Sequence, residues 1–223
     1  MISVVLVHPE TPGNVGAIAR VMKNFGFSKL LLIGPVCDHL CDEAFCRAKH
    51  AKDVLKKAKK ISWDDVKGFD LVVGTTAKMG TIYNVPRAPL TPKELASRRL
   101  PAKTALVFGP EGEGLSNQQV RECDLIVAVP TKKKYRALNI SHAVSIMLYE
   151  LSNRRDTIVD RQFASAKEKE LILKRMDEVL AGMHFPTPHA RETQSKVWKR
   201  IIGKSFLTKR EAFALLGFLK KLK

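Results

Sequence analysis

The sequence predicts an α/β protein in which a mostly parallel sheet is covered by helices on both faces and a small helical extension follows at the C-terminus. Short, almost continuous apolar segments alternate with helix-like segments, a pattern typical of parallel strands that are buried on both faces. No strand pattern occurs after residue 160. We therefore expect one α/β domain over residues 1–155 and a basic helical extension over residues 156–223.

Apolar segments that end near Gly, Pro or Thr are predicted to be the strands: residues 2–7, 30–33, 71–73, 105–108 and 125–129. A helix is predicted over residues 14–25, because Asn14 is a good N-cap and Gly26 tolerates the left-handed conformation at a helix end. The other segments between the strands are predicted to be one or two basic helices, a proline-rich loop and an apolar helix, over residues 42–60, 79–92 and 139–151.

The extension is predicted to contain three helices, over residues 166–180, 191–202 and 208–222. Thr208 and Glu211 have the spacing of a capping box, which marks the start of the last helix. Residues 156–223 carry 15 basic and 8 acidic side chains, so this part of the chain is denser in positive charge than the rest.

The whole chain has a formal net charge of +17, from 39 lysines and arginines against 22 acidic residues. Such a field attracts polyanions, so RNA, DNA and anionic membranes are candidate partners, beside the simpler interpretation of a merely basic surface. No apolar segment reaches the roughly 18 residues of a membrane span. The N-terminus has no basic region before its apolar residues, so we interpret it as a first strand rather than a signal peptide and expect a cytoplasmic protein.

Three of the four cysteines lie close to two histidines in the sequence. Cys37, His39, Cys41, Cys46 and His50 fall within fourteen residues, so a metal site must be considered. Their spacing does not match the C-x2-C pairs of zinc modules, and we interpret them as thiols that bind no metal.

The first of three chemically informative segments is GNVGAIAR, residues 13–20. Its glycines suit the close approach of another backbone or of a ligand. Arg20 falls about one and a half turns into the predicted helix, at a position that suits either a solvated side chain or a functional one.

The second segment is FGPEGEGLS, residues 108–116, at the end of a predicted strand. Its glycines allow unusual backbone angles, but no Lys-Ser/Thr pair follows and the spacing is not that of a dinucleotide loop. Glu111 and Glu113 would repel phosphate, so a polar uncharged or cationic ligand fits better. A purely structural loop capped by Ser116 is the alternative.

The third segment is VPTKKKYRALNISHAVS, residues 129–145. It contains a basic cluster, formed by Lys132, Lys133, Lys134 and Arg136. The cluster surrounds Tyr135, and basic residues around an aromatic ring suit a phosphate backbone with a stacked base. An exposed solvated loop is the alternative. Asn139 and Ser141 then begin the apolar helix.

In their order and spacing, these segments resemble the three motifs of the SpoU/TrmH family of SPOUT methyltransferases, and within it the TrmJ-like tRNA 2′-O-methyltransferases. The resemblance covers about residues 1–155: VLVHPETPGNVGAIARVMKNFG resembles the first motif, GPEGEGLS the second and residues 126–146 the third. It implies a trefoil knot in the C-terminal part of the domain, which the general avoidance of knots would not suggest. It also implies a homodimer in which each active site is completed near the partner's first motif.

The resemblance further implies S-adenosylmethionine as the methyl donor, held largely by backbone contacts at Thr75, Thr76, Gly109, Ile126, Val129, Pro130 and Leu138. The catalytic residues that it implies are Asn14, Arg20, Glu111 and Asn139. Arg20 is expected to contact RNA as well, together with Lys132, Lys133, Lys134 and Arg136. One departure concerns the third motif, which usually reads Ser-Leu-Asn and here has Ala137 in place of the serine.

The function that the resemblance implies is methylation of a ribose 2′-hydroxyl of tRNA, at position 32 of the anticodon loop on cytidine and/or uridine, with no metal. Because a guanidinium is not deprotonated in proteins, we interpret Arg20 as a stabiliser of the developing alkoxide rather than as a base. The alternatives are a ribosomal RNA 2′-O-methyltransferase and an inactive RNA-binding module, which Ala137 favours. A DNA-binding regulator that uses the C-terminal helices as a helix-turn-helix is a further alternative.

Overall fold

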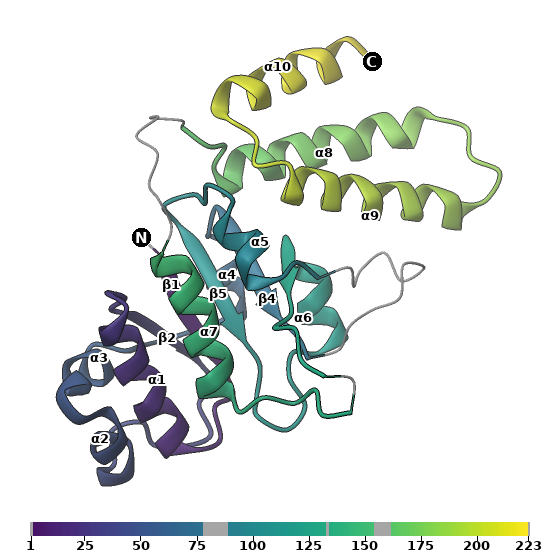
Figure 1. The fold of residues 1–223 in the computed structure, drawn as a ribbon. Coiled ribbons are helices and arrows are strands. Elements are labelled where there is room, and N and C mark those ends of the chain that lie inside the picture. The colour runs from purple at the N-terminus through teal and green to yellow at the C-terminus, as the bar shows by residue number, and fades with distance from the viewer. Residues whose placement is uncertain (1, 78–88, 133, 154–161, 223) are drawn as a thin grey trace.

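The computed structural model describes residues 2–77, 89–132, 134–153 and 162–222, and a six-stranded sheet lies at its centre (Figure 1). The strands are β1 (Ile2–Val7), β2 (Lys29–Ile33), β3 (Lys59–Ile61), β4 (Leu71–Thr75), β5 (Thr104–Phe108) and β6 (Leu125–Val127). They lie in the order β3-β2-β1-β5-β4-β6, and all neighbouring strands are parallel. The predicted parallel α/β architecture is confirmed.

Helices follow the strands and cover both faces of the sheet. They are α1 (Pro12–Asn24), α2 (Asp42–Ala48), the 3-10 turn η1 (Lys49–Ala51), α3 (Lys52–Lys56), α4 (Trp63–Val66), α5 (Pro92–Ala96), α6 (Asn117–Glu122) and α7 (Ile140–Ser152). Alternate residues of β1 show the two faces. Val4 and Leu6 pack into the larger core with α1, α2, α3, α5 and α7, whereas Val5 and Val7 pack into a smaller core with Val66 of α4.

The C-terminal residues form a separate helical unit with its own core. Its helices are α8 (Ala166–Gly182), α9 (Pro188–Lys204) and α10 (Lys209–Leu219), followed by the 3-10 turn η3 (Lys220–Leu222). Ile172, Leu180 and Leu216 are among its buried residues. Thr208 and Glu211 form the predicted capping box at the start of α10. The three predicted helices are therefore confirmed, with slightly different ends.

This unit lies at one end of the sheet of the α/β domain (Figure 1), and specific contacts join the two. Lys169 of α8 donates from Nζ to the backbone oxygen of Asp70 at 2.6 Å, and the Ala166 N–H donates to the Asp70 carboxylate at 3.1 Å. Gly203 of α9 lies so close to Asp124 that a Cβ at this glycine would be 2.9 Å from the Asp124 carboxylate. Because Asp70 and Asp124 directly precede β4 and β6, the contacts place the basic extension at the amino ends of these two strands.

Several predicted details of the α/β domain are wrong. Helix α1 begins at Pro12, because proline favours the first turn of a helix, so Asn14 is not its N-cap. The short strand β3 occupies the end of a segment predicted as helical. The last strand ends at Val127 rather than at residue 129. The helices α4 and α6 are too short to leave a periodic pattern, and neither was predicted.

Residues 79–88 of the predicted proline-rich loop lie outside the described residues, and Pro92 begins helix α5. The trefoil knot stays a prediction.

Within the described ranges, every helix is too short or too polar to cross a membrane.

Candidate active site

A cavity of about 580 Å³ opens at the carboxyl ends of β4, β5 and β6. Parallel α/β sheets bind ligands at this edge, and the volume is that of a small-molecule site. The ends of these three strands, the segments that follow them and helix α7 supply its lining: Thr75, Thr76, Ala77, Phe108, Gly109, Pro110, Glu111, Gly112, Glu113, Gly114, Val127, Val129, Arg136, Ala137, Leu138, Ile140, Ala143 and Met147. Residues of the second and third motifs therefore share one cavity.

The implied donor-binding residues divide into two groups. Thr75, Thr76, Gly109, Val129 and Leu138 line the cavity, whereas Ile126 and Pro130 do not. The Thr75 hydroxyl donates to the backbone oxygen of Val107 at 3.0 Å, so this side chain also ties β4 to β5. Ile126 is buried within β6, and its backbone oxygen accepts from the Leu90 N–H at 2.8 Å.

The loop after β5 folds tightly over its own first residue. A Cβ at Gly109 would collide with the backbone of Gly114 and Leu115, so this glycine is required by the loop itself. Gly114 has φ +71°, and its N–H donates to the Pro110 oxygen at 2.9 Å. Ser116 caps α6 through a capping box with Gln119. The loop is thereby fixed on both sides of Glu111.

A chain of hydrogen bonds at the rim of the cavity joins one residue from each motif. Asn14 donates from Nδ2 to Oε1 of Glu111 at 3.0 Å, and Asn139 donates from Nδ2 to Oδ1 of Asn14 at 3.0 Å. Oδ1 of Asn139 accepts from both the N–H and the hydroxyl of Ser141, at 2.8 and 2.7 Å. Because Asn14 is not a helix cap, its side chain is available for these hydrogen bonds.

The chemistry of the groups fixes the direction of every bond. An ionised carboxylate only accepts, so the amide NH₂ of Asn14 must face Glu111. The Asn14 oxygen then faces the NH₂ of Asn139, which leaves the Asn139 oxygen to cap α7. Both asparagine side chains are therefore held in one orientation from either end.

Hydrogen bonding keeps Glu111 ionised. Partial burial alone would raise the pKa of this carboxyl, but bonds from the Asn14 side chain and from the backbone N–H groups of Glu10, Glu111 and Thr11 outweigh it, so the pKa lies below the ordinary 4.5. The Glu10 and Thr11 N–H groups donate at 3.1 and 3.2 Å. The carboxylate thus fixes the start of α1 as well as Asn14.

A second depression of about 260 Å³ lies beside the hydrogen-bonded side chains of Asn14 and Asn139. It is lined by Thr11, Gly13, Asn14, Ala17, Glu43, Arg47, Asn139, Ser141 and His142. Arg47 and His142 were not predicted as site residues, because a single residue on a helix carries no motif. Ser141 was predicted only to begin the apolar helix together with Asn139. Its place two residues after the helix-capping asparagine is the signal that could have assigned it to the hydrogen-bonded chain.

The basic cluster of the third motif is exposed beside the cavity. Lys132, Lys134 and Arg136 are exposed, and Arg136 also lines the cavity. Tyr135 leaves 81% of its surface open to solvent. Lys133 lies outside the described residues. The predicted combination of cations and an aromatic ring therefore sits next to the loops that form the cavity.

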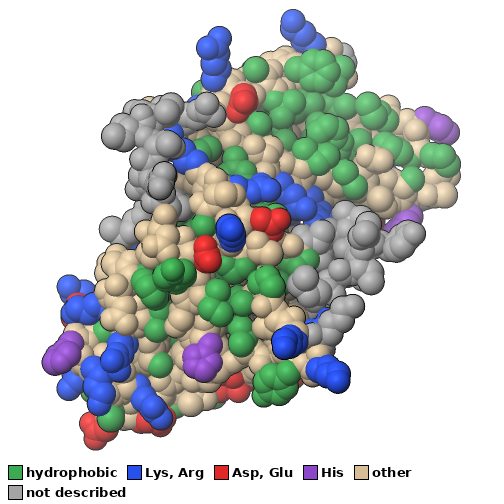
Figure 2. Space-filling model, viewed as in Figure 1, with side chains coloured by type: hydrophobic (Ala, Val, Ile, Leu, Met, Phe, Trp, Pro, Cys, Tyr) green, Lys and Arg blue, Asp and Glu red, His purple; other side chains and the backbone are tan. Residues whose placement is uncertain are grey.

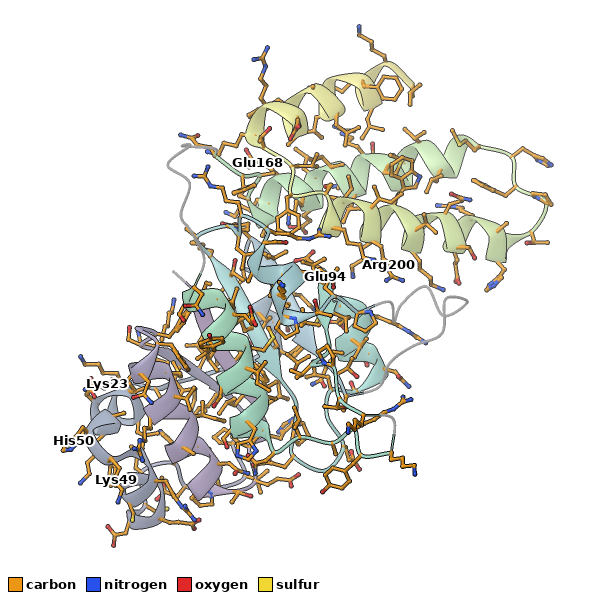
Figure 3. All side chains as sticks on the ribbon, viewed as in Figure 1. Lys23, Lys49, His50, Glu94, Glu168 and Arg200 are labelled. Atoms are coloured by element: carbon orange, nitrogen blue, oxygen red, sulfur yellow. The ribbon has the colours of Figure 1, made fainter. Side chains whose placement is uncertain are left out.

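Arg20 does not line the cavity of its own chain. It is exposed on α1 and lines another depression, of about 490 Å³, together with Lys23, Lys49 and His50. Figure 3 labels the last three residues, which lie around the C-terminal end of α1 and away from the cavity loops. Among the described residues, the Arg20 side chain has no hydrogen bond or ion pair.

The cysteines do not form a metal site in the described parts of the chain. Cys37, Cys41, Cys46 and Cys123 are all free thiols. No group of three His, Cys, Asp or Glu side chains in these parts is arranged to hold a metal ion. Burial raises the pKa of the Cys123 thiol to about 12, and this cysteine packs against the smaller core.

Comparison with known proteins identifies relatives over the whole chain. Residues 1–149 match the SpoU rRNA Methylase family. A protein of Methanocaldococcus jannaschii named tRNA (cytidine-2′-O-)-methyltransferase TrmJ is 38% identical over 228 residues, which cover 99% of both chains. The tRNA (cytidine/uridine/adenosine-2′-O-)-methyltransferase TrmJ of Pseudomonas aeruginosa is 30% identical over 98% of this chain and 92% of its own.

The fold agrees with these relatives. The crystal structure of TrmJ from Z. mobilis ZM4 superposes with a TM-score of 0.74 at 27% identity, over 100% of this chain and 99% of that chain. The match therefore includes the C-terminal helices as well as the sheet. With its parallel sheet and with its three motifs joined by hydrogen bonds, the chain belongs to the SpoU rRNA methylase family and is a relative of the TrmJ 2′-O-methyltransferases.

Proposed function

We propose that this protein methylates a ribose 2′-hydroxyl of tRNA, with S-adenosylmethionine as the methyl donor. The observation that supports this most directly is the hydrogen-bonded chain of Glu111, Asn14 and Asn139. It unites the three motifs at the rim of a cavity of about 580 Å³, a size that suits a nucleoside-like donor. A positively charged surface and an exposed tyrosine lie next to it, as an RNA substrate requires.

The cavity fits the proposed donor in its chemistry. Apolar side chains, including Phe108, Val127 and Leu138, offer a surface for the adenine ring. Glu111 and Glu113 also line the cavity and are opposite in charge to a sulfonium and an amino group. When bound, S-adenosylmethionine supplies a methyl group on a positively charged sulfur, which is open to attack by an oxygen.

The side chains of the site would hold and activate the ribose. The attacking hydroxyl has to be aligned with the methyl group and has to lose its proton, so positioning supplies much of the rate. Asn14 and Asn139 are held rigidly for this task, and the ionised Glu111 fixes their orientation. A cationic guanidinium, that of Arg20, stabilises the oxygen as negative charge develops on it, directly or through an RNA phosphate.

The position of Arg20 supports a homodimer. This side chain lines a depression of its own chain that is separate from the donor cavity. We propose that Arg20 of the partner subunit completes each active site. The second depression, next to Asn14 and Asn139, would then receive the nucleotide between the two chains.

The names of the relatives support tRNA as the substrate. The M. jannaschii relative is named for cytidine, and the P. aeruginosa relative for cytidine, uridine and adenosine. Cytidine is the base common to both, and we propose it as the main target. Position 32 of the anticodon loop stays a prediction, as does the cytoplasmic location.

The test is to incubate the protein with labelled S-adenosylmethionine and unmodified tRNA, and to map ribose methylation at each nucleotide. We expect one methylated cytidine in the anticodon loop. Ribosomal RNA fragments and duplex DNA serve as competing substrates. Methylation of ribosomal RNA in preference to tRNA would contradict the proposal, and donor binding without transfer to any RNA would favour an inactive RNA-binding module.

A further inference from the structure

Three cationic side chains meet where the extension joins the α/β domain. Arg98 follows α5, whereas Arg200 and Lys204 lie one turn apart on α9. The Arg98 guanidinium lies over the ring of Phe206, two residues beyond Lys204. Burial lowers the pKa of Lys204, and the charges of Arg200 and Arg98 lower it further. Figure 2 shows Lys and Arg side chains gathered along the band between the extension and the sheet domain.

The positive charge of the cluster is not neutralised by ion pairs within the described residues. Atom Nη1 of Arg200 is buried and has no hydrogen-bond partner, and burial lowers the pKa of this guanidinium. Among the described residues, none of the three cations forms an ion pair. Glu94 of α5, labelled with Arg200 in Figure 3, is the acid near Arg98. Its carboxylate already accepts from the N–H and the hydroxyl of Thr91, at 2.7 and 2.9 Å.

Aromatic residues of the extension fix the wall of this site. The Arg98 guanidinium lies over the Phe206 ring, 5.4 Å from its centroid, and Phe206 packs edge-on against Phe163 at 6.5 Å. A cation above an aromatic face is attracted to it, which holds Arg98 in place. Residues of both the α/β domain and the extension therefore build the cluster.

Partly buried cations without an ion-pair partner are costly, because their donors lose water and nearby like charges repel. A planar guanidinium fork matches two oxygens of a phosphate, and a second cation strengthens such a contact. We propose that Arg98, Arg200 and Lys204 form a phosphate-binding site at this junction, and that a backbone phosphate of the RNA substrate occupies it. The identity of the occupant rests on the proposed function.

Such a site has a specific consequence for substrate binding. A phosphate held by Arg98 on one side and by Arg200 and Lys204 on the other connects the extension to the domain that carries the donor cavity. Substrate binding would then neutralise the repulsion between these groups and fix the extension relative to the cavity. The extension thereby recognises the RNA backbone jointly with the α/β domain rather than alone.

The first test uses inorganic phosphate with the complete protein. Thermal melting is measured in phosphate and in chloride at equal ionic strength, for the unchanged protein, Arg200→Gln and Lys196→Gln. Lys196 is the matched control, because it lies one turn earlier on α9, is exposed and pairs with Glu192 at 3.1 Å. At about ten times the phosphate Kd, Tm should rise by about 2–5 °C in the unchanged protein and in Lys196→Gln.

Arg200→Gln should lose this rise. In chloride it should melt at the same temperature as the unchanged protein or higher, because it removes a partly buried charge that has no ion-pair partner among the described residues. Equal rises in all three proteins would overturn the site. Melting of Arg200→Gln at a lower temperature in chloride, with the rise in phosphate intact, would assign Arg200 a structural role and would overturn the site as well.

The second test separates an RNA phosphate from a free one. For tRNA, Arg200→Gln should raise Kd about tenfold and should reduce the slope of log K against log salt by about 0.9, while Lys196→Gln changes Kd less than about twofold. A phosphate effect on melting with unchanged tRNA affinity would overturn the RNA occupant. If the unchanged protein methylates no tRNA, the proposed function fails, and the melting test still decides whether the phosphate site exists.

Discussion

Arg20 carries a charge that no described neighbour neutralises, and its proposed role depends on that charge. We expect Arg20→Ala to reduce the methylation rate by about 10²–10³-fold, the usual effect of removing one group that stabilises developing negative charge. Donor affinity and Tm should stay close to those of the unchanged protein, because Arg20 is exposed and lies outside the cavity. Single-turnover rates with donor and tRNA both saturating provide the measurement.

The substitution Arg20→Lys separates charge from geometry. A lysine keeps the charge but loses the planar grip on phosphate and hydroxyl, so it should restore little activity if geometry matters. A steep recovery at alkaline pH would show that a neutral lysine acts as a base, and would favour proton abstraction by this residue over charge stabilisation. Turnover by Arg20→Ala close to that of the unchanged protein would move the reaction centre elsewhere.

Glu111 should make stability depend on pH in a defined direction. Its pKa in the folded protein lies below the ordinary 4.5, so its stabilising effect is complete above that value and is lost as pH falls through the folded pKa. We expect Glu111→Gln to melt at a lower temperature than the unchanged protein at pH 7, and the difference in Tm to shrink as pH falls below about 4.5. A difference that stays constant down to pH 3 would show that the carboxylate charge is not involved.

At the scale of elements, the loop after β5 requires a glycine at its first position. The side chain of Gly109→Val would collide with the backbone of Gly114 and Leu115, so this variant should lose donor binding measured by calorimetry. Gly112→Ala is the matched control in the same loop, because a Cβ there meets no protein atom within 4 Å. It should weaken donor binding less than about fivefold. Equal losses of donor affinity in both variants would show that any added side chain in this loop weakens binding, and that the close backbone approach at Gly109 is not the cause.

Helices and strands were predictable from the sequence where a buried face imposes a regular spacing of apolar residues over many positions. The strand over residues 2–7 and the three C-terminal helices show this, since their apolar spacing is set by a core on one or both sides. Strand β3 was not predictable. Its two lysines are exposed and it is held by backbone pairing with β2, which leaves no apolar signal.

The geometry of the candidate site was not predictable from the sequence. The resemblance to the family motifs implied Asn14, Glu111 and Asn139, but their hydrogen bonds depend on the approach of segments about 100 residues apart, which the sequence pattern does not encode. The start of α1 illustrates this. A helix beginning at Asn14 would have occupied its side chain in capping, whereas the start at Pro12 leaves that side chain to bond Glu111.

At the scale of the whole molecule, the extension should contribute to RNA binding and not to donor binding. It has its own core, separate from the two cores that support the cavity. Removal of residues 161–223 should raise the Kd for tRNA about tenfold or more, a loss of roughly 1.4 kcal/mol that a few phosphate contacts supply. Donor affinity by calorimetry should be retained. Full tRNA methylation by the truncated and still dimeric protein would contradict this division of roles.

The proposed dimer predicts that two inactive variants restore activity when they pair. Arg20→Ala has an intact donor cavity, and Gly109→Val has an intact Arg20. If each site combines the cavity of one chain with Arg20 of the other, a mixed dimer contains one complete site. Random pairing makes about half of the dimers mixed, so co-expression should restore about a quarter of the activity of the unchanged protein.

Sites built within single chains would give a different result. Each variant would then be inactive in any combination, and the mixture would show only the residual activity of the two variants alone. A second mixture, of Arg20→Ala with the double variant Arg20→Ala/Gly109→Val, provides the control, because it forms mixed dimers that have no Arg20 at all. Recovery in the first mixture and not in the second would therefore require that Arg20 acts across the dimer, and no recovery in either would place the active site within one chain.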